Sequence, residues 1–206
     1  MPFEFGSVQN SIVIDVLREI GNIGAGNAAT SLANLINKKV DMKVPVVSLL
    51  EFSEVPEILG GAENIVAGIF FKIEGDITGS IMFVLDRKSA FNLVNLLMPI
   101  DAKEFDEMTR SALMEIGNIL SGAYISSLSA LTNLNLKISV PAICIDMAGA
   151  ILSVPAIEFG LVADQVMIIK NEFVDEITSE MVDGYFFLIP DYDSYDRLLG
   201  SLGVQL

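Results

Sequence analysis

The sequence predicts an α+β fold built around a largely antiparallel sheet, and three observations lead to this prediction. Apolar residues recur at helical spacing early in the chain, at Ile12, Val16 and Ile20. Two strand-like apolar runs follow, with the turn signal Gly75-Asp76 between them, which favours a hairpin. The same order of helical and strand-like patterns then occurs a second time, which is typical of a duplicated domain.

The repeat organises the whole chain. Residues 15–45 and 111–141 align without a gap at an offset of 96, and 13 of the 31 positions are identical. The identical pairs are Leu17/Leu113, Glu19/Glu115, Ile20/Ile116, Gly21/Gly117, Asn22/Asn118, Ile23/Ile119, Gly26/Gly122, Ser31/Ser127, Leu32/Leu128, Leu35/Leu131, Asn37/Asn133, Val44/Val140 and Pro45/Pro141. Two copies are too few for a solenoid. The sequence therefore predicts a single domain over residues 1–206, made of two homologous halves, about 8–100 and 104–206, related by a pseudo-twofold axis.

Each half is expected to contain the same elements in the same order. For the first half these are a helix ending near Ile23, a helix at 27–37, a short extended segment entering Pro45, strands at 64–75 and 76–86, and a helix at 89–98. For the second half they are a helix around 113–120, a helix at 123–133, an extended segment entering Pro141, strands at 163–176 and 184–191, and a helix at 194–203.

The charge and the residue types exclude several classes of function. The chain of 206 residues is 52% apolar and 19% charged, which is typical of a globular protein. Its net charge of −15 disfavours binding to nucleic acid or to anionic lipid. With no histidine and one cysteine, the chain has no Ser-His-Asp triad, no Cys-His pair and no ordinary zinc cluster. We expect Cys144, in an alternating apolar stretch, to be a small buried core residue.

The apolar runs of the chain bear on its localisation. Residues 1–10 lack a basic segment followed by an apolar one, so they do not resemble a secretory signal. The runs at 68–71, 80–85 and 166–170 are far shorter than a membrane span requires. The sequence therefore predicts a soluble, cytoplasmic protein, and the internal duplication favours a monomer.

A glycine-rich string at residues 24–29, Gly-Ala-Gly-Asn-Ala-Ala, fits the spacing of a dinucleotide-binding loop. That loop needs a strand before the glycines, whereas the preceding pattern here is helical, and the second copy does not keep the first glycine. We therefore reject a nucleotide site. The glycines retained in both copies, Gly21/Gly117 and Gly26/Gly122, predict either close packing of helices or a break between two helices.

The polar residues retained in both copies are harder to explain by packing. Glu19 and Asn22 stand three residues apart and share a helix face, as do Glu115 and Asn118. Retention of this pair, where other exposed positions diverged, indicates a function or a shared structural bond. A carboxylate can hold a cationic side chain, and a carboxamide can orient a water molecule. Such a pair suits the attack of water on an activated electrophile, as in phosphoryl transfer.

On these residues the chain resembles the CheC/CheX/FliY family of chemotaxis phosphatases. The family signature is Asp or Ser, three residues, Glu, two residues, Asn, twenty-two residues, Pro. The residues that match it are Asp15, Glu19, Asn22 and Pro45 in the first half, and Ser111, Glu115, Asn118 and Pro141 in the second. Two complete matches, with no room for an appended switch domain, favour the two-site CheC-like members over the single-site CheX-like and longer FliY-like ones.

The resemblance implies a phosphatase that hydrolyses the aspartyl phosphate of the response regulator CheY. It implies that Glu19 and Glu115 each bind a lysine of CheY. It also implies that Asn22 and Asn118 each direct the attacking water. No cofactor of the chain's own is expected, because Mg²⁺ is implied to belong to the regulator. The two sites are expected to act independently.

The other signature residues are expected to support the sites. Asp15 and Ser111 are implied to be helper residues, either N-terminal caps of the helices or outer hydrogen-bonding partners. Pro45 and Pro141 are implied to be structural.

The family also implies a second partner, the receptor deamidase CheD. It is expected to dock on the helical region after the second proline, near residues 144–151, with Asp146 as the charged contact. A buried or helix-capping Asp146 is an equally open interpretation. Two other functions stay open. One is a non-catalytic module that binds the regulator in the chemotaxis or flagellar-switch system, and the other is a structural protein of the flagellar switch.

Overall fold

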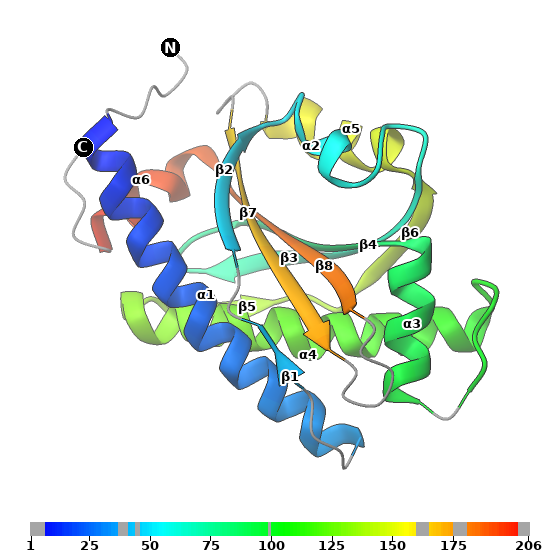
Figure 1. Ribbon diagram of the computed structural model, residues 1–206. Helices are drawn as coiled ribbons and strands as arrows, with labels where there is room; N and C mark the ends of the chain where they lie inside the picture. The colour runs from blue at the N-terminus through cyan, green and yellow to red at the C-terminus, as the bar shows by residue number, and fades with distance from the viewer. Residues whose placement is uncertain are drawn as a thin grey trace.

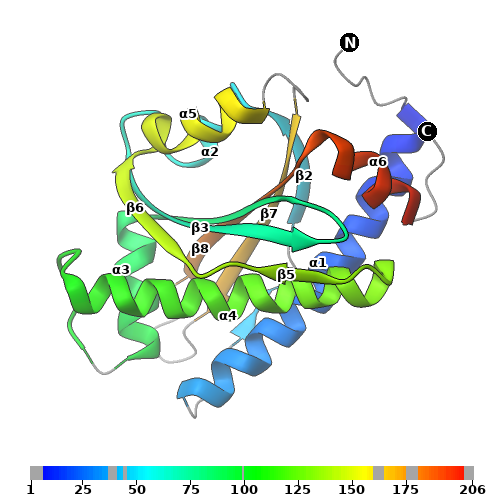
Figure 2. The same cartoon turned by 180° about the vertical axis from the view of Figure 1, so that it is seen from behind.

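A computed structural model describes residues 7–36, 41–43, 46–98, 100–159, 165–174 and 181–201. Its strands are β1 (Asp41–Met42), β2 (Val46–Glu51), β3 (Ile65–Gly75), β4 (Gly79–Asp86), β5 (Leu136–Ile138), β6 (Ala142–Met147), β7 (Gln165–Val174) and β8 (Met181–Pro190). Its helices are α1 (Ser7–Ile36), α2 (Val55–Ile58), α3 (Arg87–Leu97), α4 (Glu107–Thr132), α5 (Ala148–Phe159) and α6 (Tyr192–Ser201). Figures 1 and 2 show a twisted sheet with helices on both of its faces. The predicted α+β class is confirmed.

The strand order has an internal symmetry. All pairs are antiparallel, in the order β1-β7-β8-β4-β3-β5, with β2 also pairing with β7 and β6 with β3. The hairpins β3–β4 and β7–β8 are equivalent, and β4 pairs with β8 at the centre. The helices repeat in the same order. The positions that α1, α2 and α3 take among the strands of the first half are taken in the second half by α4, α5 and α6. The pseudo-twofold axis of the described part of the chain therefore passes between β4 and β8.

Each face of the sheet has its own apolar core. Helices α1, α3, α4 and α6 contribute to one core, and α2 and α5 contribute to the other. Along β4, Ile81, Phe83 and Leu85 join the first core, while Met82 and Val84 join the second. A strand that is buried on both faces has a continuous apolar sequence, as this one does.

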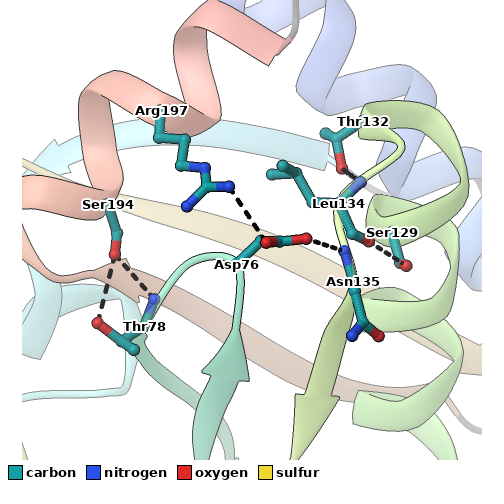
Figure 3. A network of polar contacts seen from close by, with 8 residues as sticks. All are labelled: Asp76, Thr78, Ser129, Thr132, Leu134, Asn135, Ser194 and Arg197. Atoms are coloured by element: carbon teal, nitrogen blue, oxygen red, sulfur yellow. Dashed lines mark hydrogen bonds and ion pairs between the residues drawn. The ribbon is translucent and has the colours of Figure 1, made fainter.

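The turn between β3 and β4 is tied to two helices, as Figure 3 shows. Gly75 opens the turn with φ at +124°, a backbone conformation that favours glycine. The Asp76 carboxylate accepts a hydrogen bond from the backbone N–H of Asn135, just beyond α4, at 2.7 Å. It also pairs with Arg197 of α6, with 3.1 Å between Oδ1 and Nη2. The turn that the sequence predicts at Gly75-Asp76 thus also fixes the C-terminal end of α4 against the sheet.

The expectation of two consecutive helices at the start of each half is wrong. Both α1 and α4 continue through their glycines without a break. A glycine inside a helix costs only about 1 kcal/mol, so tertiary packing can hold the helix together. Close packing is what Gly117 provides, because an added Cβ would lie 3.0 Å from Cγ2 of Ile69. Although α1 and α4 are long, neither they nor any other described helix is apolar enough to cross a membrane.

The region after Pro141 shows a second correction. The resemblance implies a helical region near 144–151, but residues 144–147 belong to strand β6 and only 148–151 to helix α5. Strands β2 and β6 and helix α2 are not predicted from the sequence. Within β6 the side chains of Ile143 and Ile145 turn inward, whereas Cys144 and Asp146 are exposed. The expectation of a buried Cys144 is therefore wrong, because alternation predicts two faces but not which of them meets the core.

Candidate active sites on helices α1 and α4

The two motif helices cross on one face of the sheet and run in opposite directions (Figures 1 and 2). Tyr124 of α4 holds the crossing. An added Cβ on Gly24 of α1 would lie 2.5 Å from the ring of Tyr124, so the glycine lets the helices approach. The Tyr124 hydroxyl donates a hydrogen bond to Oδ1 of the fully buried Asn171 on β7. Burial raises the pKa of Tyr124, which keeps this donor protonated.

A second link lies between the helices themselves. Nδ2 of Asn27 on α1 donates to Oγ of Ser127 on α4 at 3.2 Å. The hydroxyl of Ser127 donates in turn to the carbonyl of Ala123 at 2.8 Å. In α1 the retained counterpart Ser31 makes the same bond to the carbonyl four residues earlier, at 2.9 Å. The helices thus form a fixed platform for the residues on their outer faces.

The two Glu-Asn pairs lie along the length of these helices, away from the helix ends. Glu19 and Glu115 are exposed, whereas Asn22 and Asn118 are half-buried. Within the described residues, none of the four side chains has a hydrogen bond or an ion pair. Oδ1 of Asn22 is moreover buried without a hydrogen-bond partner. An unpaired buried acceptor costs about 1–3 kcal/mol, and this oxygen can gain a partner from outside the chain only after the Asn22 side chain turns outward.

The expectation that Asp15 and Ser111 cap the helices is wrong. Helix α1 is already formed by Ser7, and α4 is capped by Asp106, whose Oδ1 accepts from the Thr109 backbone N–H at 2.8 Å. The hydrogen bonds from Thr109 lower the pKa of Asp106. Asp15 instead forms an exposed ion pair with Arg18, Oδ1 to Nη1 at 2.9 Å. Both helices simply begin upstream of the motif.

Asn118 opens on a groove between the two helices, with a volume of about 500 Å³. The residues that line it are Asn118, Ile119, Gly122, Ala123 and Ser126 of α4, and Asn27, Thr30 and Ser31 of α1. The contributions from α1 are functional candidates that sequence reasoning missed. The available signal was the retention of Ser31 as Ser127, but only the crossing of the helices shows which residue faces which.

The remaining predicted positions lie away from this platform or outside the description. Pro45 lies outside the described residues. Pro141 is half-buried and leads directly into β6. Asp146 is exposed on β6, opposite Val66 of β3, and its Oδ1 accepts from the Met147 backbone N–H at 2.8 Å. It is therefore neither buried nor a helix cap, and it is not brought together with the Glu-Asn pairs.

These groups define what the sites can do chemically. In the described part of the chain, no three His, Cys, Asp or Glu side chains are placed to hold a metal ion. Each site instead offers an unpaired carboxylate that can receive a cation, and a carboxamide that can donate to and accept from water at Asn118 but only after a turn of the side chain at Asn22. The arrangement suits docking of a cationic protein surface and orientation of a water molecule.

Comparison with known proteins gives the class of this fold and site. The family model for the CheC-like family matches residues 12–49, and the one for chemotaxis phosphatase CheX matches residues 66–161. Flagellar motor switch phosphatase FliY from Bacillus subtilis is 32% identical over 63% of this chain and 34% of its own length. The crystal structure of Thermotoga maritima FliY superposes with a TM-score of 0.73 at 23% identity, covering 98% of both chains, which shows the shared fold.

A relative that matches along nearly its whole length narrows the class to one family. CheY-P phosphatase CheC from Bacillus subtilis is 39% identical, over 94% of this chain and 95% of its own length. The chain therefore belongs to the CheC-like family.

Proposed function

We propose that this chain hydrolyses the aspartyl phosphate of phosphorylated CheY. The observation that carries the proposal is the pair of Glu-Asn faces whose side chains lack internal partners in the described residues. The CheC relative that shares nearly the whole chain is named a CheY-P phosphatase, which supports the same substrate. Its name and the free polar groups point to one reaction, the attack of water on an acyl phosphate.

Each residue of a pair has a distinct part in this reaction. Glu19 and Glu115 receive a lysine of CheY, which brings the phosphoaspartate to the helix face. The carboxamides of Asn22 and Asn118 accept a hydrogen bond from the attacking water and aim its lone pair at phosphorus, in line with the leaving carboxylate. A new P–O bond to water forms, the P–O bond to the aspartate breaks, and inorganic phosphate leaves. The acidic pocket of the regulator would hold the Mg²⁺ that the resemblance implies, and the ion would supply charge neutralisation at the phosphoryl oxygens.

The test is the rate of phosphate release from phosphorylated CheY in the presence of Mg²⁺. The unsubstituted chain is expected to shorten the lifetime of the phosphoryl group. The double variant Glu19→Gln with Glu115→Gln is expected to raise KM about 10- to 100-fold, which corresponds to the free energy of one charge-assisted hydrogen bond. The matched control is Glu57→Gln with Glu63→Gln, two exposed glutamates at and after α2, on the other side of the sheet. An unchanged phosphate lifetime with the unsubstituted chain would refute the proposal.

A non-catalytic binding module is the second candidate, and one observation favours it for the first half. Oδ1 of Asn22 is buried, so this face can bind a partner more readily than it can aim a water molecule. A pure binding module associates with phosphorylated CheY but leaves the decay of its phosphoryl group unchanged. Measuring binding and phosphate release on the same samples separates the two functions.

We also propose that the receptor deamidase CheD binds this protein near Asp146. The residue is exposed on β6, on the same face of the strand as the exposed Cys144, so its carboxylate is open to a partner protein. The variant Asp146→Asn is expected to weaken CheD binding, whereas Glu74→Gln, an exposed acid on β3, is expected to leave it unchanged. Equal affinities for both variants in a titration would contradict this contact.

A further inference from the structure

The groove at Asn118 is built from both halves of the chain. Asn118 lies on α4, in the second half, and Ser31 lies on α1, in the first. The hydroxyls of Ser31 and Thr30 bond to carbonyls of their own helix, each at 2.9 Å. This wall of the groove is therefore internally satisfied, and it presents a surface that a neighbouring protein can cover without leaving a polar group unpaired.

One turn beyond Ser31, on the same face of α1, stands Leu35. It is 48% exposed, although it is a large apolar residue. The residues of α4 that line the same groove as Ser31 include Asn118 and Ile119. Leu35 thus lies one turn beyond the wall that α1 contributes to the groove at Asn118.

The same arrangement recurs in the other half. Leu131, the counterpart of Leu35, is 43% exposed and stands one turn beyond Ser127 on α4. A single exposed leucine is ordinary on a protein surface. Both copies keep a leucine at this exposed position, although the neighbouring position differs, with Asn34 in the first copy and Ala130 in the second. Retention of the leucine indicates that the two positions share a function. Packing into the core does not account for it at these exposures.

We propose that each active site is completed by the helix of the other half, with Leu35 of α1 as an apolar docking contact for the Asn118 site and Leu131 of α4 for the Asn22 site. This rests on the proposed function, because the occupant is the phosphorylated response regulator. Its surface has to offer a cation to Glu115 and an apolar patch to Leu35. The unpaired acid at Glu115 and the net charge of −15 provide the electrostatic attraction for such a surface.

The test is a crossed substitution experiment. Leu35→Ala is made in an Asn22→Ala background, where only the Asn118 site works, and in an Asn118→Ala background, where only the Asn22 site works. The KM for phosphorylated CheY rises about fivefold more in the first background than in the second, as expected for loss of an interface anchor. Leu131→Ala gives the opposite pattern. Leu35→Met, which conserves the apolar volume, restores the KM.

The outcomes separate this inference from the proposed function. Equal losses in both backgrounds show a structural role for Leu35 and overturn the inference, as does no loss in either. Because Leu35 and Leu131 are half-exposed, thermal melting is expected to change little for these variants. If the unsubstituted chain does not hydrolyse the phosphoryl group, the proposed function fails. Affinity for phosphorylated CheY, measured for Leu35→Ala and Leu131→Ala in Glu19→Gln and Glu115→Gln backgrounds, then decides whether each leucine serves the site of the other half.

Discussion

In the second half of the molecule Asn118 opens on a groove of about 500 Å³, whereas in the first half Oδ1 of Asn22 is buried and has no partner in the described part of the chain. The two asparagines belong to identical Glu-Ile-Gly-Asn strings on equivalent helices. What differs is the set of residues around them. At the crossing, Tyr124 of α4 packs on Gly24 of α1, while their counterparts are Ala28 and Leu120. The comparison teaches that a motif fixes the face of a helix, and that the neighbouring helix decides how accessible the face is.

Unequal activity of the two sites is the largest effect expected from this difference. Asn118→Ala removes more than half of the phosphate release, and Asn22→Ala removes less, because the buried carboxamide of Asn22 has to turn before it can reach a water molecule. Initial rates for the two single variants, at the same concentration of phosphorylated CheY, measure the ratio. A larger loss with Asn22→Ala would reverse the assignment of the faster site.

The helix crossing can be broken at one glycine and left intact at another. Gly24→Ala is expected to destabilise the fold by about 1–3 kcal/mol, since its Cβ would lie 2.5 Å from the ring of Tyr124. Gly26→Ala, two residues along the same helix, meets nothing within 4 Å and is expected to stabilise by about 0.5–1 kcal/mol. Urea unfolding of both variants checks the pair. Effects of the same sign would contradict the role of Gly24 in the crossing.

The hydrogen bond from Tyr124 to Asn171 links α4 to the sheet. Its counterpart in the first half is Ala28, whose side chain cannot form such a bond. Tyr124→Phe leaves Oδ1 of the buried Asn171 without this donor and costs about 1–3 kcal/mol. Burial raises the pKa of Tyr124, so the native state keeps its proton where the unfolded chain loses it. Tyr124 therefore makes stability fall as pH rises above about 10, by up to about 1.4 kcal/mol per pH unit, and the substitution removes this share of the slope. Burial also raises the pKa of Tyr185, which adds to the slope in the same direction. A slope unchanged in Tyr124→Phe would assign it to other groups.

The smallest effect concerns Ser121, which is fully buried and whose Oγ has no hydrogen-bond partner among the residues that the structure describes. Its counterpart in the first half is Ala25, also buried. Ser121→Ala is expected to stabilise the fold by about 1 kcal/mol, because it removes an unsatisfied polar group without opening a large cavity. A rise of a few degrees in the melting temperature checks it. A lower melting temperature would indicate a partner for this hydroxyl.

Sequence patterns predicted the features that depend on local geometry. The spacing of Glu19 and Asn22 places both on one helix face, and the Gly75-Asp76 signal marks the turn of the β3–β4 hairpin. The continuity of α1 could not be predicted, since packing of Gly24 on Tyr124 outweighs the low helix propensity of glycine.

Features that depend on contacts between distant segments escaped prediction. Alternation along 142–147 predicts two faces, but only the position of β6 beside β3 shows that Cys144 is outside. The share of Ser31 in the groove at Asn118 follows from the crossing of α1 and α4, which no local pattern encodes. Nor does any pattern show that the two helices begin upstream of Asp15 and Ser111. Because they do, neither residue can be an N-terminal cap.

The central claim is that twin carboxamides direct water at the phosphoryl group, and one double variant tests it directly. Asn22→Ala with Asn118→Ala keeps both glutamates, so it is expected to bind phosphorylated CheY as the unsubstituted chain does. With this protein and Mg²⁺ present, the account predicts that the aspartyl phosphate decays no faster than it does on CheY alone. Decay at the rate given by the unsubstituted chain would contradict the account.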